Sequence, residues 1–134
     1  MIAIDTTIAV AFLRGETRSV SAVRSALEST NSLGISSVSL FELLHPIHHR
    51  KLEREERTVR SFIHQLTLLP LDTEAAEEAA KIMGGLMRIG QPVNALDVLI
   101  AGTAVANGAE KLLSSDRDFE KISKVSDLKL EIVH

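Results

Sequence analysis

Short apolar segments alternate with helix-forming segments along the whole chain. Five of these segments have the composition of strands: residues 2–4, 33–36, 67–71, 111–114 and 128–133. Uninterrupted apolar runs are typical of strands that are buried on both faces, and such strands belong to parallel sheets. Strands that alternate with helices predict a parallel sheet covered by helices on both faces. We therefore expect one α/β domain over residues 1–134, an α/β/α sandwich with a five-stranded parallel sheet.

Helices are predicted between these strands because the apolar residues there recur at helical spacing. The expected helical ranges are 8–13, 17–30, 39–45, 48–60, 73–89, 95–107 and 117–122. Pro46 should end or kink the third helix near His45, because proline disrupts the backbone hydrogen bonds of a helix. Pro70 fits an edge strand or the end of a strand rather than the middle of the sheet. The fifth helix, capped by Asp72 or Thr73, is expected to turn five side chains inward: Ala76, Ala79, Ala80, Met83 and Met87.

Composition restricts the classes of function. Cysteine is absent, which excludes disulfides and thiolate metal sites and fits a reducing compartment. The net charge is −3, so a nucleic acid would have to be held locally, by a basic patch or through bound cations. Trp and Tyr are absent, which disfavours recognition of bases by stacking. The chain has no basic, apolar start and no run of about 18 apolar residues, so we expect a cytoplasmic protein without a membrane span.

Four acidic residues occur at the junctions between strands and helices. Asp5 directly follows the first strand, and Glu42 is expected in the first turn of the helix after the second strand. Asp97 begins the helix that leads to the fourth strand, and Asp116 comes just after that strand. In an open α/β sheet, ligands bind beyond the carboxyl ends of the strands. We therefore expect the four carboxylates to project from one rim of the sheet.

Each of these acids also has a purely structural interpretation. Asp97 is the third residue of a helix that Asn94 can cap, where a carboxylate suits the helix dipole. Asp5 can cap the helix that follows it, and Ser39 with Glu42 has the pattern of a capping box. Capping does not explain why all four acids share one rim. Nor does it explain an acid directly after a buried strand, where a charge is costly unless it is paired.

Carboxylates that converge raise one another's pKa, and a divalent cation relieves their repulsion. Ligand sets made only of oxygen select Mg²⁺ or Mn²⁺ rather than zinc. Such a centre binds phosphate oxygens, lowers the pKa of a water and stabilises in-line displacement at phosphorus. It would also let an acidic protein hold a polyanion at one point. The four acids therefore predict metal-dependent phosphodiester chemistry.

Four sequence blocks carry these acids: residues 4–7 (IDTT), 41–44 (FELL), 97–104 (DVLIAGTA) and 113–119 (LSSDRDF). Their order and spacing, over essentially the full length, resemble those of the PIN domain. This family of small metal-dependent ribonucleases includes the VapC-type toxins of bacterial and archaeal toxin–antitoxin pairs. The resemblance implies the same five-stranded α/β/α fold and cleavage of RNA by an activated water with Mg²⁺ or Mn²⁺.

By position, the resemblance implies a catalytic, metal-binding quartet: Asp5, Glu42, Asp97 and Asp116. It implies supporting roles for three further residues: Thr6, Ser114 and Asp118. Ser114 stands where the family more often has threonine and keeps the hydroxyl. In the toxin branch, the resemblance also implies a homodimer, an RNA substrate and an antitoxin protein that inhibits the enzyme. Single-domain PIN nucleases that process RNA without an antitoxin are the alternative within the family.

Two further functions stay open at this point. The segment Asp5-Thr6-Thr7 is faintly similar to the start of the haloacid dehalogenase phosphatases, which use an aspartyl nucleophile. That family has a second acid where this chain has Thr7. The other possibility is a non-catalytic PIN-like module that only binds a partner, although such a module has no need to keep clustered carboxylates that repel one another.

Residues 45–60 carry two weaker motifs. His45, His48 and His49 are spaced for one helical face and suit a soft metal, but Pro46 interrupts that helix and no carboxylate partner is evident. A basic cluster follows: Arg50, Lys51, Arg54, Arg57 and Arg60. Glutamates alternate with it, which favours a solvated helix face with i,i+4 pairs and leaves contact with RNA or a partner as the alternative.

Overall fold

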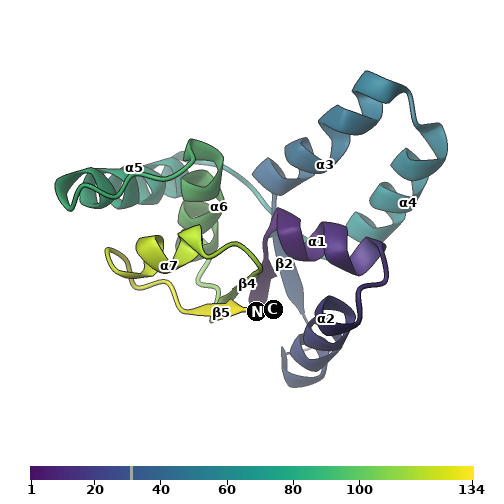
Figure 1. Ribbon diagram of the computed structural model, residues 1–134, viewed down its shortest axis with the longest axis horizontal. Helices are drawn as coiled ribbons and strands as arrows, with labels where there is room; N and C mark the ends of the chain where they lie inside the picture. The colour runs from purple at the N-terminus through teal and green to yellow at the C-terminus, as the bar shows by residue number, and fades with distance from the viewer. Residues whose placement is uncertain (31) are drawn as a thin grey trace.

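The computed structural model describes residues 1–30 and 32–134, and these form five strands and seven helices (Figure 1). In chain order the elements are β1 (Ile2–Ile4), α1 (Thr6–Leu13), α2 (Thr17–Thr30), β2 (Leu33–Ser36), α3 (Ser37–Arg50), α4 (Glu53–His64), β3 (Thr67–Leu69), α5 (Thr73–Arg88), α6 (Ala95–Ala106), β4 (Leu112–Ser114), α7 (Asp118–Ser123) and β5 (Leu130–Ile132). The expected alternation of strands and helices is therefore confirmed.

The five strands form one parallel sheet in the order β3-β2-β1-β4-β5. The chain moves from β1 towards one edge through β2 and β3, and then crosses back to place β4 on the other side of β1. Parallel crossovers are right-handed, so this reversal sends helices to opposite faces. Figure 1 shows α1–α4 on one side of the sheet and α5–α7 on the other. The predicted α/β/α sandwich is confirmed, and β3 is an edge strand as Pro70 predicted.

The side chains of the sheet pack into two separate hydrophobic cores, one on each face. Along β1, Ile2 and Ile4 pack into the core beneath α1–α4, whereas Ala3 packs into the core beneath α5–α7. The pattern follows from the pleat, which turns successive side chains to opposite faces. The three central strands β1, β2 and β4 are buried on both faces, which explains why they carry almost no polar side chains.

Helices α5 and α6 cross at very close range. A Cβ atom at Gly102 would lie 2.6 Å from the backbone nitrogen of Ala79, so only glycine fits this position of α6. The buried face of α5 carries mostly small side chains for the same reason: Ala75, Ala79, Ile82, Gly85 and Leu86. The prediction of an inward face with Ala76, Ala80 and Met87 was wrong. Met87 is 67% exposed. The close approach of α6, rather than the size of the side chains, determines which face of α5 is buried.

Helix α3 continues through Pro46 to Arg50, so the predicted end of the helix near His45 was wrong. Proline removes one backbone hydrogen bond, and the buried side chains of Leu43 and Ile47 hold the helix on either side of it. The chain breaks instead at Lys51, which has a left-handed backbone (φ 54°) and separates α3 from α4.

The predicted helix over residues 48–60 is therefore two helices, and the order of its charges fits the break. His48, His49 and Arg50 form the last turn of α3, where positive charge suits the helix dipole. Three glutamates form the first turn of α4, where negative charge suits it: Glu53, Glu55 and Glu56.

Candidate active site

The four acids predicted to converge line one cavity of about 560 Å³: Asp5, Glu42, Asp97 and Asp116. The cavity lies beyond the carboxyl ends of β1 and β4, where the strand order reverses. This switch point is the place where α/β sheets bind ligands, because the neighbouring connections leave in opposite directions. The structure therefore brings the four predicted residues together, whereas their catalytic roles stay predictions.

Asp5 is only 2% exposed and is held by three donors. Its Oδ1 atom accepts hydrogen bonds from the backbone N–H of Ile8 at 3.0 Å and from the hydroxyl of Thr7 at 2.7 Å. Its Oδ2 atom accepts one from the hydroxyl of Ser114 at 2.5 Å. Burial raises the pKa of Asp5, and these hydrogen bonds offset part of that rise. Asp5 is thus the N-cap of α1, as its structural interpretation predicted, and it also lines the cavity.

The hydroxyls that hold Asp5 also accept hydrogen bonds from the loop after β4. Thr7 Oγ1 accepts from the N–H of Ser115 at 2.9 Å, and Ser114 Oγ accepts from the N–H of Asp116 at 2.9 Å. Each hydroxyl therefore donates to Asp5 and accepts from the loop. The start of α1 is joined in this way to the segment that carries Asp116.

Glu42 lies on α3 and also lines the acidic cavity. The hydroxyl of Thr6 donates to Glu42 Oε1 at 2.6 Å. Ser39 Oγ lies 3.0 Å from Thr6 Oγ1, and it is the donor of that pair because the Thr6 proton points to the carboxylate. The predicted capping box was wrong: Ser36, at the end of β2, caps the helix by accepting from the N–H of Val38 at 3.0 Å.

The helix therefore starts before Ser39, and Glu42 lies beyond its first turn. Ser36 can end the strand and cap the helix at once because no loop separates β2 from α3. Val38, in the first turn of α3, is buried.

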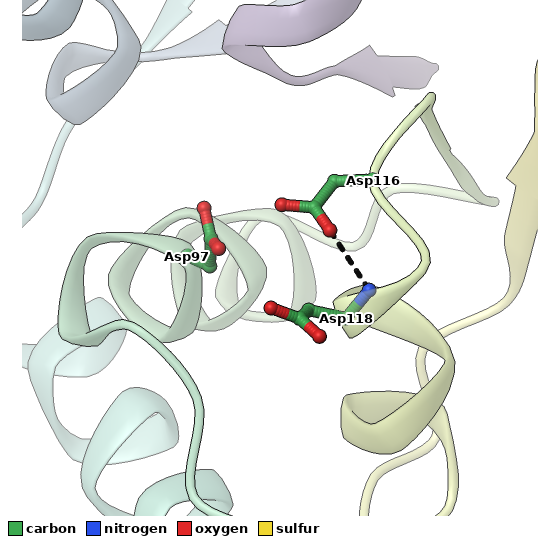
Figure 2. Close-up of side chains that lie close together, drawn as sticks. All are labelled: Asp97, Asp116 and Asp118. Carbon is green, nitrogen blue, oxygen red and sulfur yellow. Dashed lines mark hydrogen bonds between the residues drawn. The ribbon is translucent and has the colours of Figure 1, made fainter.

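The tightest cluster of carboxylates is Asp97, Asp116 and Asp118, whose oxygen atoms lie within 4.8 Å of one another (Figure 2). Asp97 is the third residue of α6, and Asn94 caps that helix as predicted by accepting from the N–H of Leu96 at 2.8 Å. Asp116 precedes α7 and accepts from the N–H of Asp118 at 2.9 Å. All three carboxylates point into the space between α6 and the start of α7.

This crowding changes the acidity of Asp97. Partial burial is the largest cause of a rise in its pKa to about 7, and the negative charges of four neighbours contribute the rest of that rise: Asp116, Glu42, Asp5 and Asp118. No donor contacts the Asp97 carboxylate within the described residues, so nothing compensates for its lost hydration. Oxygen-only donors that repel one another suit a hard divalent cation, which keeps part of its water shell. The residues present therefore fit Mg²⁺ or Mn²⁺.

The carboxylates that lie closest together are not the four of the predicted quartet. Asp118, predicted only as a supporting residue, belongs to the tight cluster, whereas Asp5 and Glu42 line the cavity with oxygens engaged by hydroxyls. Arg14 also lines the acidic cavity, and no motif in the sequence indicates this position. The structure puts Arg14 in the lining of the cavity because α1 ends at Leu13, one residue before it.

The weaker motifs of residues 45–60 lie outside this cavity. His48 Nδ1 lies 3.9 Å from Glu56 Oε1, and the ring of His45 packs on Phe41 with centroids 5.2 Å apart. Among the described residues no histidine joins a group that could hold a metal. Arg60 pairs with Glu56 at 2.8 Å, which confirms one of the expected i,i+4 pairs. Over the same part of the chain, no helix is long and apolar enough to cross a membrane.

Comparison with known proteins agrees with this architecture. Residues 2–125 match the family model of the PIN domain. The chain therefore belongs to the PIN domain family, and the sequence resemblance to it is confirmed. Strand β5 lies beyond the matched residues, so a domain that extends to residue 134 stays a prediction.

Within this family the chain is similar to VapC proteins. It is 36% identical over 95 residues to the tRNA(fMet)-specific endonuclease VapC of Salmonella typhimurium strain LT2, which covers 70% of this chain and 72% of that protein. The structure of VapBC2 from Rickettsia felis bound to a promoter DNA fragment superposes with a TM-score of 0.85 at 23% identity and covers all of both chains. DNA-bound VapBC from Salmonella typhimurium gives a TM-score of 0.79 at 26% identity, covering 98% of this chain and 96% of that one.

Proposed function

We propose that this protein is an endoribonuclease that depends on Mg²⁺ or Mn²⁺ and acts as the toxin of a toxin–antitoxin pair. One observation carries the proposal: the carboxylates of Asp97, Asp116 and Asp118 crowd within 4.8 Å, and two of them, Asp97 and Asp116, line one cavity together with Asp5 and Glu42. The similarity to a VapC endonuclease named for a tRNA substrate supports RNA as the polymer that is cut.

In this proposal, Asp97, Asp116 and Asp118 hold the cation. A cation bound there supplies positive charge to the phosphate oxygens and lowers the pKa of a water. The chain's own residues prepare the site around it. Asp5 is fixed by three donors, so its carboxyl group keeps one position at the floor of the cavity.

Glu42 is the proposed acceptor of the proton from the attacking water. Its Oε1 atom is engaged by Thr6, which orients the carboxylate, and Oε2 has no partner within the described residues. A general base must lie within hydrogen-bond reach of the proton that it takes. The predicted quartet thus keeps its catalytic role, Asp118 joins it, and Thr6 and Ser114 are the supporting hydroxyls.

The proposed partners follow from the same similarity. The resemblance to VapC-type toxins implies that the toxin forms a homodimer and that an antitoxin protein inhibits it. The likeness to structures of VapBC toxin–antitoxin systems supports the antitoxin as a partner of this chain. A cytoplasmic location fits a protein that reaches cellular RNA. A PIN nuclease that processes RNA without an antitoxin would share the same site, so co-purification from the native host separates the two: a small bound protein supports the toxin.

The test of the proposed activity uses the purified chain, freed of any bound protein, with RNA in Mg²⁺, Mn²⁺ or EDTA. Asp97→Asn should lower cleavage by at least about 100-fold, because a metal centre contributes several kcal/mol to the transition state. The matched control is Asp127→Asn, which removes the same charge from an exposed position outside the acidic cavity.

Three outcomes would contradict the proposal. Cleavage by Asp97→Asn at the wild-type rate would show that Asp97 has no catalytic role and only stabilises the start of α6. Partner binding without RNA cleavage in any divalent metal would indicate a non-catalytic module. A trapped acyl-phosphate on Asp5 with a chromogenic phosphate ester would indicate a phosphatase instead.

A further inference from the structure

Arg14 is the single basic residue among the described residues that line the acidic cavity. It is exposed to solvent and directly follows the last residue of α1. Five acids line the same cavity: Asp5, Glu16, Glu42, Asp97 and Asp116. A guanidinium beside so many carboxylates either forms an ion pair with one of them or is available to an anionic ligand.

The Arg14 guanidinium makes no ion pair and no hydrogen bond with any residue in ranges 1–30 and 32–134. Three other arginines are engaged: Arg18 by the carbonyl of His134, Arg60 by Glu56 and Arg117 by Glu120. Arg14 therefore stands apart from the carboxylates of its own cavity and keeps all of its side-chain donors for a ligand.

Helix α1 determines where Arg14 lies relative to the acids. One face of this helix lines the cavity, and it carries Thr7, Val10, Ala11 and Arg14. Residues three, four and seven positions apart share one side of a helix. Asp5 is the N-cap of α1 and Arg14 is its C-cap, so this helix of eight residues separates their backbones by about 12 Å. The cavity therefore runs along α1 from Asp5 to Arg14.

A polyanion in this cavity needs positive charge at more than one place. In the proposed function, the cation held near Asp97 compensates the charge of the phosphate that is cut. The flanking phosphates of the RNA meet a protein with a net charge of −3 and a cavity lined by acids. A guanidinium suits such a phosphate, because its planar fork can donate two parallel hydrogen bonds to the phosphate oxygens.

We propose that Arg14 binds a backbone phosphate of the RNA that flanks the phosphodiester cut at the other end of the cavity. This inference rests on the proposed ribonuclease function and adds a substrate-binding residue to it. Because Arg14 stands apart from the carboxylates, it contacts the substrate and the transition state equally. Such a contact lowers KM and leaves kcat unchanged.

The test removes the charge of Arg14 and measures cleavage at saturating Mg²⁺. Arg14→Gln should raise the KM for RNA by roughly 10-fold with kcat unchanged, because it deletes charge-assisted hydrogen bonds. The slope of log KM against log salt should fall by about 0.7, the value for one phosphate of a single strand. The matched control is Arg24→Gln, which removes the same charge from an exposed position of α2 outside the acidic cavity and should change neither quantity.

Arg14→Lys separates contact with RNA from a structural role. Arg14 also ends α1, where a positive charge suits the helix dipole. The lysine variant keeps this charge, so it should recover the salt slope and most of the loss in KM. A residue that only stabilises the helix end would instead lower the urea midpoint in Arg14→Gln and leave KM unchanged, which would overturn the inference.

A binding measurement on the Asp97→Asn background leaves the RNA intact. The probes are labelled single-stranded RNAs in which one phosphate at a time is replaced by a neutral methylphosphonate. Adding Arg14→Gln should weaken the binding of unmodified RNA by roughly 10-fold, measured by fluorescence anisotropy. This loss should vanish for the RNA that lacks the phosphate bound by Arg14, because the two changes then remove the same contact.

Two results would overturn the inference: an equal KM for Arg14→Gln and Arg24→Gln, or a loss of binding that persists with every methylphosphonate RNA. The failure of the proposed function gives a different result. If the wild-type protein cuts no RNA in any metal while Arg14→Gln still weakens binding at one phosphate, the ribonuclease proposal fails and the contact between Arg14 and RNA stands.

Discussion

Asp5 and Glu42, on one side of the acidic cavity, have carboxylates held by hydroxyl and amide donors, whereas Asp97, on the other side, faces only further carboxylates. Both sides present acids to the same cavity, but the free-energy cost of keeping a charged carboxylate there differs between the two sides. Donors offset part of the cost of burying Asp5, although burial still leaves its pKa raised. Asp97 has no such compensation, so its charge opposes folding until a cation is present.

The largest expected effect is that of the metal on the uncompensated side. Mg²⁺ at about 100 times its Kd should add about 2.7 kcal/mol to the free energy of unfolding of the wild-type protein, because the cation binds only the folded cluster. Asp97→Asn should remove most of this gain. Calorimetric or urea unfolding with Mg²⁺ and with EDTA measures it, and an equal gain in Asp97→Asn would contradict the assignment of the cluster.

Asp5→Asn should destabilise the metal-free protein by about 2 kcal/mol, because a carboxamide has one acceptor oxygen for three donors and turns an N–H towards one of them. Urea unfolding in EDTA measures the loss. Asp127→Asn is the control for removal of a surface charge. An unchanged midpoint for Asp5→Asn would show that the donors around Asp5 do not stabilise the fold.

Asp97→Asn should change the stability in the opposite direction, by about 1–2 kcal/mol after allowance for solvent screening. The carboxyl of Asp97 has a raised pKa of about 7 in the folded chain, against 3.8 for an ordinary aspartate. The folded state therefore binds the proton more tightly, and the wild-type protein loses stability as the pH rises from about 4 to about 7.

The gain from Asp97→Asn should consequently be absent near pH 4 and complete above about pH 7. Urea midpoints measured in EDTA across this range give the difference between the two proteins. A variant that follows the pH dependence of the wild type would exclude charge crowding at Asp97.

The smallest expected effect on stability is that of Thr6→Val, which removes the donor to Glu42 while keeping the shape of the side chain. It should cost about 1 kcal/mol, the usual value for one hydrogen bond. Cleavage should fall by more than stability suggests, because Glu42 then loses its orientation. RNA cleavage at saturating metal measures this, and an unchanged kcat would exclude Glu42 as an oriented base.

The sheet and the rim of acids could be predicted from the sequence because both follow from general rules. Apolar runs define buried parallel strands, and parallel strands present their carboxyl ends at one edge. Which carboxylates of the rim lie closest to Asp97 could not be predicted. Whether Asp118 or Asp5 joins Asp97 depends on where α7 begins and on which hydroxyls reach Asp5, and Ser114 is distant from it in the sequence.

The errors on α3 and α5 have a similar origin. Pro46 predicts a break from local backbone chemistry, but tertiary burial of its neighbours outweighs one lost hydrogen bond. The buried face of α5 is set by the close approach of Gly102 to Ala79, which no periodicity within α5 reveals. In both cases a contact between distant segments decided the local structure.

The hydrogen bond from Ser114 to Asp5 joins residues 109 positions apart in the chain. Until Ser114 has been synthesised and has folded against β1, the Asp5 carboxylate lacks this donor. Asp97 also lacks its neighbours Asp116 and Asp118, which come later still in the chain. A growing chain therefore cannot complete the acidic site until nearly all of its residues have been synthesised.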